Sequence, residues 1–210
     1  MSWIDRIFLL GTGLIAIYLI SLFIKEYLKT CKQWNLYYSI SFAVLTISGL
    51  LLIGLGYGIL QSPLVVIVAA LIPIVFSMGL VDQYLEKYTK IYSVFATVGF
   101  IVLSFTRICE LQLLSRIVLI TVHSVAGLII FVLPFLLIKK NKVSKEFAFI
   151  SVGGALIGVG GIALAFLKAG KPILSAEIIF TILAPLLFLM CASFSIGFIK
   201  EMRKGSQVME

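Results

Sequence analysis

Residues 117–142 read IVLITVHSVAGLIIFVLPFLLIKKNK, and this stretch decides the fold. Its first 22 residues, Ile117–Ile138, contain no Asp, Glu, Lys or Arg, and three lysines lie among the next four residues. A helix needs about 20 apolar residues to cross a bilayer core of about 30 Å. An apolar run of this length that ends in a lysine cluster is typical of a membrane-spanning helix that stops at a headgroup layer.

Six further apolar runs flank this one. The chain of 210 residues is 61% hydrophobic and 12% charged, whereas a soluble domain has about 25% charged residues. The predicted spans are residues 7–24, 37–60, 64–81, 91–108, 117–138, 147–167 and 173–199. These runs do not alternate as barrel strands do, and backbone groups in lipid must pair within their own segment. The sequence therefore predicts an all-α integral membrane protein with a single seven-transmembrane-helix domain over residues 1–210.

The basic residues predict the orientation of these spans. If the N-terminus is outside, the inner segments carry 12 basic residues and the outer segments 5. The inner set is Lys25, Lys29, Lys32, Lys87, Lys90, Lys139, Lys140, Lys142, Lys145, Lys200, Arg203 and Lys204. Because cytoplasmic loops are enriched in Lys and Arg, we expect a multi-pass protein of the cell membrane with a cytoplasmic C-terminus. The net charge of +8 then indicates contacts with anionic lipid headgroups rather than with nucleic acid.

The third and seventh runs share a proline-centred pattern. Pro73–Met78 and Pro185–Met190 both match Pro-x-x-Phe-x-Met. This shared pattern suggests that spans five to seven repeat the arrangement of spans one to three, with the fourth span as a connector. Such a 3+1+3 arrangement is found in some transporters. The alternative is coincidence, because these residue types are common in membrane spans, and both interpretations stay open here.

This three-plus-one-plus-three topology is similar to that of the sugar and cystine carriers of the PQ-loop class, which implies transport. Those carriers have Pro-Gln at the ends of corresponding helices, and this chain has no Pro-Gln pair. The resemblance is therefore one of topology, and it assigns no family. A retinal-binding protein is excluded because the span at 173–199 contains no lysine.

Ionisable residues near the outer ends of the later spans form the candidate site. His123 is the single histidine, about six residues into the fifth span, and Glu177 lies at a similar depth in the seventh. The predicted substrate- or proton-binding residues are His123, Glu177, Arg107 and Lys168. Charged groups in spans commonly mark solute or proton paths. The alternative is that these groups reach the interface or form a structural ion pair.

Glycines and prolines predict packing faces and bends. The predicted helix-packing residues are Gly54, Gly58, Gly154, Gly158 and Gly161, because small residues let helices approach closely. The predicted hinges are Pro73, Pro134 and Pro185, which each remove a helical hydrogen bond.

The function that we expect is a small-solute or ion transporter or channel-like carrier with a polar vestibule on the outer side. The alternatives are a non-catalytic membrane subunit or scaffold of a larger complex, and a heptahelical sensor. Enzyme motifs are absent, and one histidine with three dispersed cysteines predicts no metal site and no cofactor. The expected partners are the lipid bilayer and either a second copy of the chain or other membrane subunits.

Overall fold

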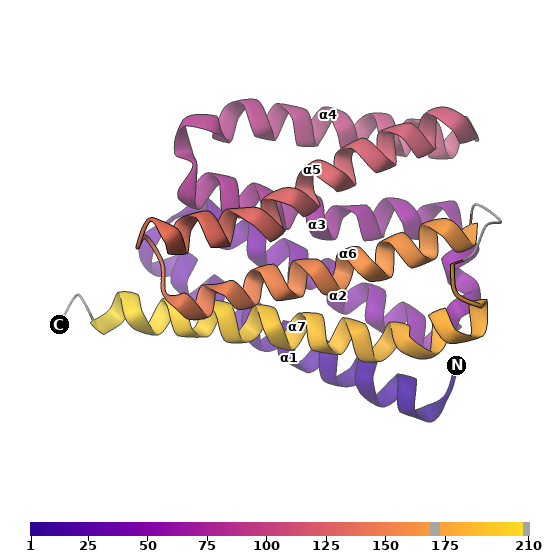
Figure 1. Ribbon diagram of the computed structural model, residues 1–210, viewed down its shortest axis with the longest axis horizontal. Helices are drawn as coiled ribbons and strands as arrows, with labels where there is room; N and C mark the ends of the chain where they lie inside the picture. Colours follow the sequence, from indigo (N-terminus) through magenta and orange to yellow (C-terminus); the bar gives the residue numbers. More distant parts are fainter. Residues whose placement is uncertain (169–172, 208–210) are drawn as a thin grey trace. The chain divides into compact units, whose positions relative to one another are not determined.

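The computed structural model describes residues 1–168 and 173–207, and its regular elements are all helices (Figure 1). The α-helices are α1 (Trp3–Thr30), α2 (Gln33–Leu55), α3 (Pro63–Tyr84), α4 (Thr89–Ile108), α5 (Gln112–Lys139), α6 (Ala148–Lys168) and α7 (Ala176–Gln207). The 3-10 helices are η1 (Tyr57–Gln61), η2 (Glu86–Tyr88) and η3 (Lys145–Phe147).

Within the described residues, seven helices are long and apolar enough to cross a membrane. This confirms the predicted set of seven apolar helices. One boundary was predicted too late, because α2 ends at Leu55 rather than at residue 60. Gly56 adopts φ 69°, and its N–H donates to the carbonyl of Leu52 at 2.8 Å. Glycine reaches this backbone region without strain, so the α-helix stops there and the chain continues as η1.

The chain divides into two compact units. Unit 1 comprises Met1–Ile15 and Ile130–Glu210, and unit 2 comprises Ala16–Ile129. Helices α1 and α5 therefore each contribute residues to both units. The predicted site residues are divided between the two units.

In unit 2, α3 packs against both α2 and α4. Aromatic rings fill the contact with α2, where Phe76 meets Tyr38 at 5.5 Å and Phe42 at 6.0 Å between ring centroids. Gly79 makes room for the Tyr38 ring, since a Cβ at this position would lie 2.6 Å from it. A second cluster joins α3, α4 and α5 through Ala70, Ile74, Ala96, Leu103 and Val122.

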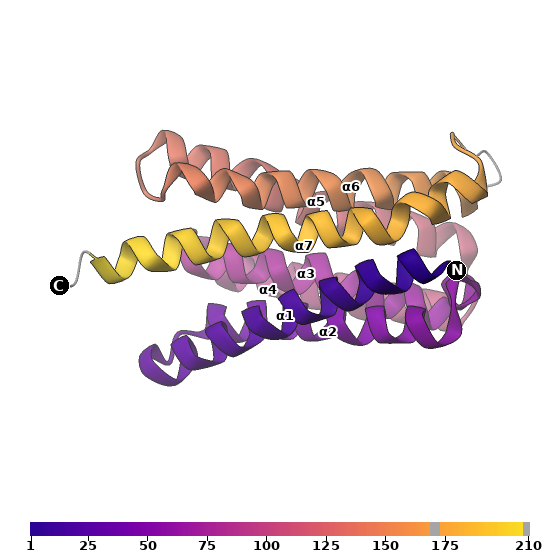
Figure 2. The ribbon, with the colours of Figure 1, turned by 90° about the horizontal axis from the view of Figure 1, so that it is seen from below.

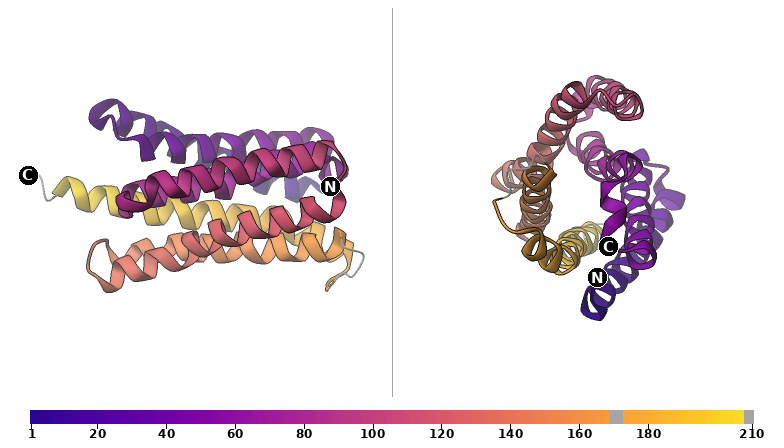
Figure 3. Two further views of the ribbon diagram at one scale, coloured as in Figure 1. Left: turned by 90° about the horizontal axis from the view of Figure 1, so that it is seen from above. Right: turned by 90° about the vertical axis from the view of Figure 1, so that its right-hand side faces the viewer.

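In unit 1, α6 and α7 lie side by side along their lengths (Figures 1 and 2). Gly153 of α6 faces the ring of Phe194 of α7, and an added Cβ would lie 2.5 Å from it. Such contacts let two membrane helices approach closely. The connection from α5 to α6 lies at the same end of unit 1 as the C-terminal turns of α7 (Figure 3).

Candidate functional site

The α4–α5 hairpin of unit 2 brings two polar residues to either side of one tight connection. Helix α4 ends at Ile108, Glu110 adopts φ 55°, and the N–H of Leu111 donates to the carbonyl of Thr106 at 2.9 Å. This bond to the last turn of α4 is typical of a helix ending with a left-handed residue. The chain therefore reverses within three residues, which places Arg107 in the last turn of α4 and Ser115 in the first turn of α5.

In the half of this hairpin that carries the connection, three side-chain atoms are buried without a hydrogen-bond partner among the described residues. They are Nε of Arg107, Oγ of Ser115 and Nδ1 of His123, and we call these residues the α4–α5 polar groups. Ser115 is 1% exposed. Leaving a buried donor or acceptor unpaired costs about 1–3 kcal/mol, and hydrocarbon offers no partner. Water or a polar solute would satisfy these atoms.

The α4–α5 polar groups follow one another from the connection into the helix pair. His123 lies eight residues after Ser115, which is about 12 Å along a helix at 1.5 Å per residue. Its neighbour Val122 is 3% exposed and contacts Gly99 of α4, where an added Cβ would lie 2.6 Å from Val122 Cγ2. His123 is thus adjacent to a close contact between α4 and α5, which fixes the position of its backbone.

The connection end of this hairpin carries two arginines, Arg107 and Arg116, and the acidic Glu110, a net charge of +1 (2 − 1). Arg107 is half-buried and interacts electrostatically with Arg116, a like charge, which is exposed on α5. Two like charges near one another favour an anionic partner. The Nε atom of Arg107 adds a hydrogen-bond donor that has no acceptor among the described residues. The geometry therefore suits a small anion, or a solute with electronegative oxygens.

The sequence-predicted site residues fall into different units. Arg107 and His123 belong to unit 2, whereas Glu177 belongs to unit 1. Glu177 is exposed in the first turn of α7, and its carbonyl accepts a hydrogen bond from Thr181 Oγ1 at 2.8 Å. Lys168 is the last residue of α6, and its side chain lies outside the described structure. The pairing of His123 with Glu177 stays a prediction.

The five predicted packing glycines differ in how closely other residues approach them. An added Cβ at Gly154 would lie 2.8 Å from Ile130, so this glycine makes a close contact. At the other four predicted packing glycines a Cβ would meet no atom of the described structure within 4 Å; these are Gly54, Gly58, Gly158 and Gly161. Gly58 lies in η1 rather than in α2. The loop predicted between the sixth and seventh spans falls at residues 169–172, outside the described residues.

The predicted hinge prolines each lie inside a helix. Pro73 is in α3, Pro134 in α5 and Pro185 in α7. The helices continue through all three positions. Their function as hinges stays a prediction.

Sequence reasoning missed Ser115, the bond of Ser41 and the pairing of Ser77 with Tyr92. Ser77 Oγ lies 2.6 Å from Tyr92 Oη, and Ser41 Oγ donates to the carbonyl of Ile72 at 2.9 Å. The spacing of Ser115 to the buried Val122 and Ala126, seven and eleven residues later, places all three on one helical face. That periodicity was the available signal for a buried hydroxyl at Ser115.

No group of three or more potential metal ligands occurs among residues 1–168 and 173–207. No model of a known protein family matches the chain, and no curated protein or solved structure matches it either.

Proposed function

We propose that this chain is a multi-pass protein of the cell membrane that carries a small polar solute or ion across the bilayer. Its N-terminus is outside and its C-terminus is cytoplasmic, as the distribution of 12 basic residues on one side and 5 on the other favours. The α4–α5 polar groups then lie at the outer end of the bundle, where they line the vestibule through which the solute enters.

The observation that carries this proposal is the absence of protein partners for Arg107 Nε, Ser115 Oγ and His123 Nδ1 among the described residues. A purely structural bundle would pair such atoms with its own backbone, as Thr121 Oγ1 does with the carbonyl of Ile117 at 2.9 Å. Unpaired polar atoms along one hairpin instead indicate a hydrated path. Because arginine carries a fixed charge, the proposed solute is anionic or rich in oxygen atoms.

His123 is the proposed proton carrier of this path. Histidine exchanges protons near neutral pH, and Glu177 is the second protonatable residue of this proposal. Coupling of proton binding to solute binding would then occur at the outer end of α5. Lys168 is a further basic residue of this proposal.

A 3+1+3 repeat is the proposed architecture behind this function. In support, α2 packs closely with α3 in unit 2, and α6 packs closely with α7 in unit 1. Both α3 and α7 contain an internal proline within the shared pattern. Parallel repeats in transporters commonly place the substrate site at their interface.

Cysteine accessibility tests the vestibule without knowledge of the solute. The exposed Cys31 and Cys109 are first replaced by Ala, and Ser115→Cys and His123→Cys are introduced singly. A charged methanethiosulfonate reagent added outside intact cells is expected to label both positions. Val122→Cys is the control, because this side chain packs against Gly99. Equal protection of all three positions would contradict a hydrated path.

Proton flux in proteoliposomes tests the coupling role. Under an imposed membrane potential, His123→Ala and Glu177→Gln are expected to lower the flux about tenfold, which corresponds to about 1.4 kcal/mol in the barrier. Thr121→Val is the matched control on the same helix, since its hydroxyl bonds its own backbone. Unchanged flux in both test variants would remove the pair from the mechanism.

A membrane subunit is the second candidate, and the open glycines of α6 favour it. Gly158 and Gly161 are exposed, and no described atom lies within 4 Å of a Cβ built at either position. Small residues on a lipid-facing surface suit a partner helix. The mass of the detergent-extracted complex decides this candidate: a lone monomer counts against it, and a co-purifying membrane protein supports it.

A further inference from the structure

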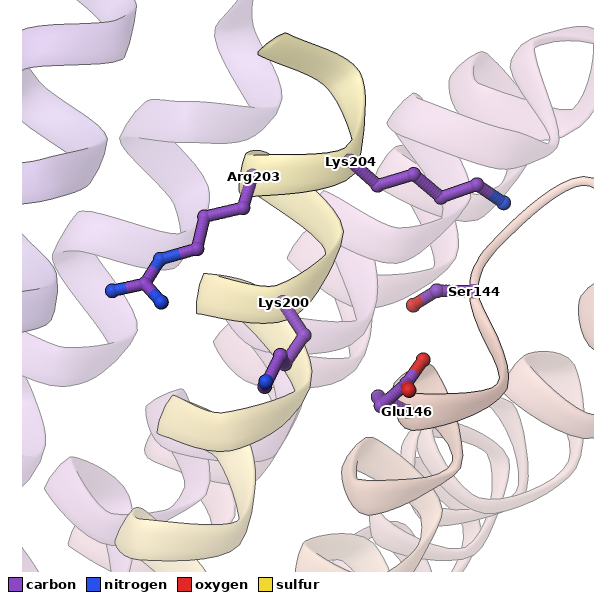
Figure 4. Close-up of a pocket in the computed structure, with 5 residues that line it drawn as sticks. All are labelled: Ser144, Glu146, Lys200, Arg203 and Lys204. Carbon is purple, nitrogen blue, oxygen red and sulfur yellow. The ribbon is translucent and has the colours of Figure 1, made fainter. Parts of the chain in front are cut away.

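A polar pocket lies where the α5–α6 connection meets the end of α7, within unit 1. Its volume is about 370 Å³, and its lining residues are Ser144, Glu146, Lys200, Arg203 and Lys204 (Figure 4). The first two belong to the connection and to η3, and the other three belong to α7. The apolar part of α7 ends at Ile199, directly before Lys200. The pocket therefore forms where a membrane span gives way to polar chain.

Ser144 contributes a buried hydroxyl that has no partner. Ser144 is 9% exposed, and its Oγ atom makes no hydrogen bond with any described residue. Its backbone N–H donates to Oε2 of Glu201 at 2.7 Å, which holds the connection against α7. The hydroxyl is thus fixed in place at the pocket wall. A buried hydroxyl in a polar cavity indicates a bound water or ligand.

The charge of the lining favours an anion. The lining residues comprise three cations, Lys200, Arg203 and Lys204, and one carboxylate, that of Glu146, which gives a net charge of +2 (3 − 1). A second carboxylate, that of Glu201, is already paired with the backbone N–H of Ser144. Figure 4 shows Lys204 on one side of Ser144 and Glu146 on the other, while Arg203 extends away from them. The connection adds further cations at Lys139, Lys140, Lys142 and Lys145.

We propose that this pocket binds a phosphate group, and that this phosphate belongs to the headgroup of an anionic membrane lipid. A water molecule occupies about 30 Å³, so the pocket has room for a phosphorylated headgroup. Ile196, one turn before Lys200, is 41% exposed and offers an apolar surface to an acyl chain. Basic clusters next to a span bind anionic headgroups. This inference is independent of the proposed transport function.

Native mass spectrometry of the full chain in detergent tests the proposal. Phosphatidylglycerol, phosphatidylcholine or inorganic phosphate is added as the probe. The double variant Lys200→Gln/Lys204→Gln is expected to bind phosphatidylglycerol about tenfold more weakly, because two charge-assisted contacts are lost. Ser144→Ala is expected to weaken binding about threefold, the loss of one neutral hydrogen bond. Lys90→Gln, an exposed lysine of α4, is the matched control and should leave binding unchanged.

Glu146→Gln is expected to change lipid binding in the opposite direction, and it distinguishes a loss of binding contacts from misfolding. Removing the one carboxylate from the lining should tighten phosphatidylglycerol binding several-fold, which no unfolded variant would do. Binding of inorganic phosphate with the same variant pattern, but without retention of phosphatidylglycerol, would support the phosphate site and assign it to a soluble ligand. Equal lipid binding by the double variant and Lys90→Gln would overturn the proposal, as would no binding of either probe.

Discussion

Helices α3 and α7 carry the same proline-centred pattern, yet its fifth residue has opposite surroundings in the two units. In unit 2, the fifth residue of the pattern is Ser77, which is 0% exposed and bonds to Tyr92. In unit 1 the fifth residue is Leu189, which is 53% exposed. The shared pattern therefore places a proline and a phenylalanine at the same spacing in each helix. It does not determine which face of the helix is buried in each unit.

The surroundings of the two prolines differ in the same way. Next to Pro73, Ser41 of α2 donates to the carbonyl of Ile72 at 2.9 Å. In α7, Phe188 lies 5.6 Å from Phe8 between ring centroids and packs against Gly11 of α1. The α3 proline thus lies beside side-chain hydrogen bonds from other helices, whereas the corresponding segment of α7 packs against an aromatic ring and a glycine. Polar residues on neighbouring helices, rather than the shared pattern, determine this difference.

Truncating the phenylalanine of each pattern should produce the largest contrast. Phe76 is 1% exposed and contacts two rings, so Phe76→Ala is expected to lower the free energy of unfolding by about 3 kcal/mol. Phe188 is half-buried, and Phe188→Ala should lower it by about 1–2 kcal/mol. Unfolding in mixed dodecylmaltoside–SDS micelles, followed by circular dichroism, measures both. Equal losses would show that the two patterns are energetically equivalent after all.

Replacing Ser77 of α3 should lower the free energy of unfolding by less than replacing Phe76. Ser77→Ala leaves the Tyr92 hydroxyl without its 2.6 Å partner, and the expected loss is about 1 kcal/mol. Ser193→Ala in α7 is the matched control, since its hydroxyl bonds the carbonyl of Leu189 in its own helix. A double-mutant cycle with Tyr92→Phe isolates the pair. A coupling energy of zero would mean that the pair contributes nothing to stability.

Hydropathy predicted the number and type of the helices because each span must be apolar over its whole length. It could not predict that α2 ends at Leu55. Residues 57–60 are as apolar as the helix before them, and the backbone angle of Gly56 decides the boundary. Hydropathy indicates which residues are suited to lipid, whereas the end of a helix depends on local backbone geometry.

The candidate site was predictable only where a charge interrupts an apolar run. Arg107 and His123 are visible in the sequence for that reason, and both have a buried unpartnered nitrogen in the structure. The burial of Ser115 could be predicted from its spacing, but the lack of a partner for its hydroxyl could not, because a hydroxyl in a span usually bonds the carbonyl one turn back, as Thr121 does. Whether a given serine does so depends on its rotamer and neighbours, which a single sequence does not specify.

Removing the interhelical hydrogen bond beside Pro73 should lower the free energy of unfolding least among the three changes. This change tests the difference between α3 and α7 most directly. Ser41→Ala removes a bond from α2 to α3, and side-chain hydrogen bonds between membrane helices average about 0.6 kcal/mol. Ser39→Ala is the matched control two residues away, because Ser39 is also buried but bonds the carbonyl of Asn35 in its own helix. If the polar bonds next to Pro73 stabilise unit 2, the first variant unfolds at a lower SDS fraction than the second. Coincident unfolding curves would leave the aromatic contacts of Phe76 as the main support of α3 against α2.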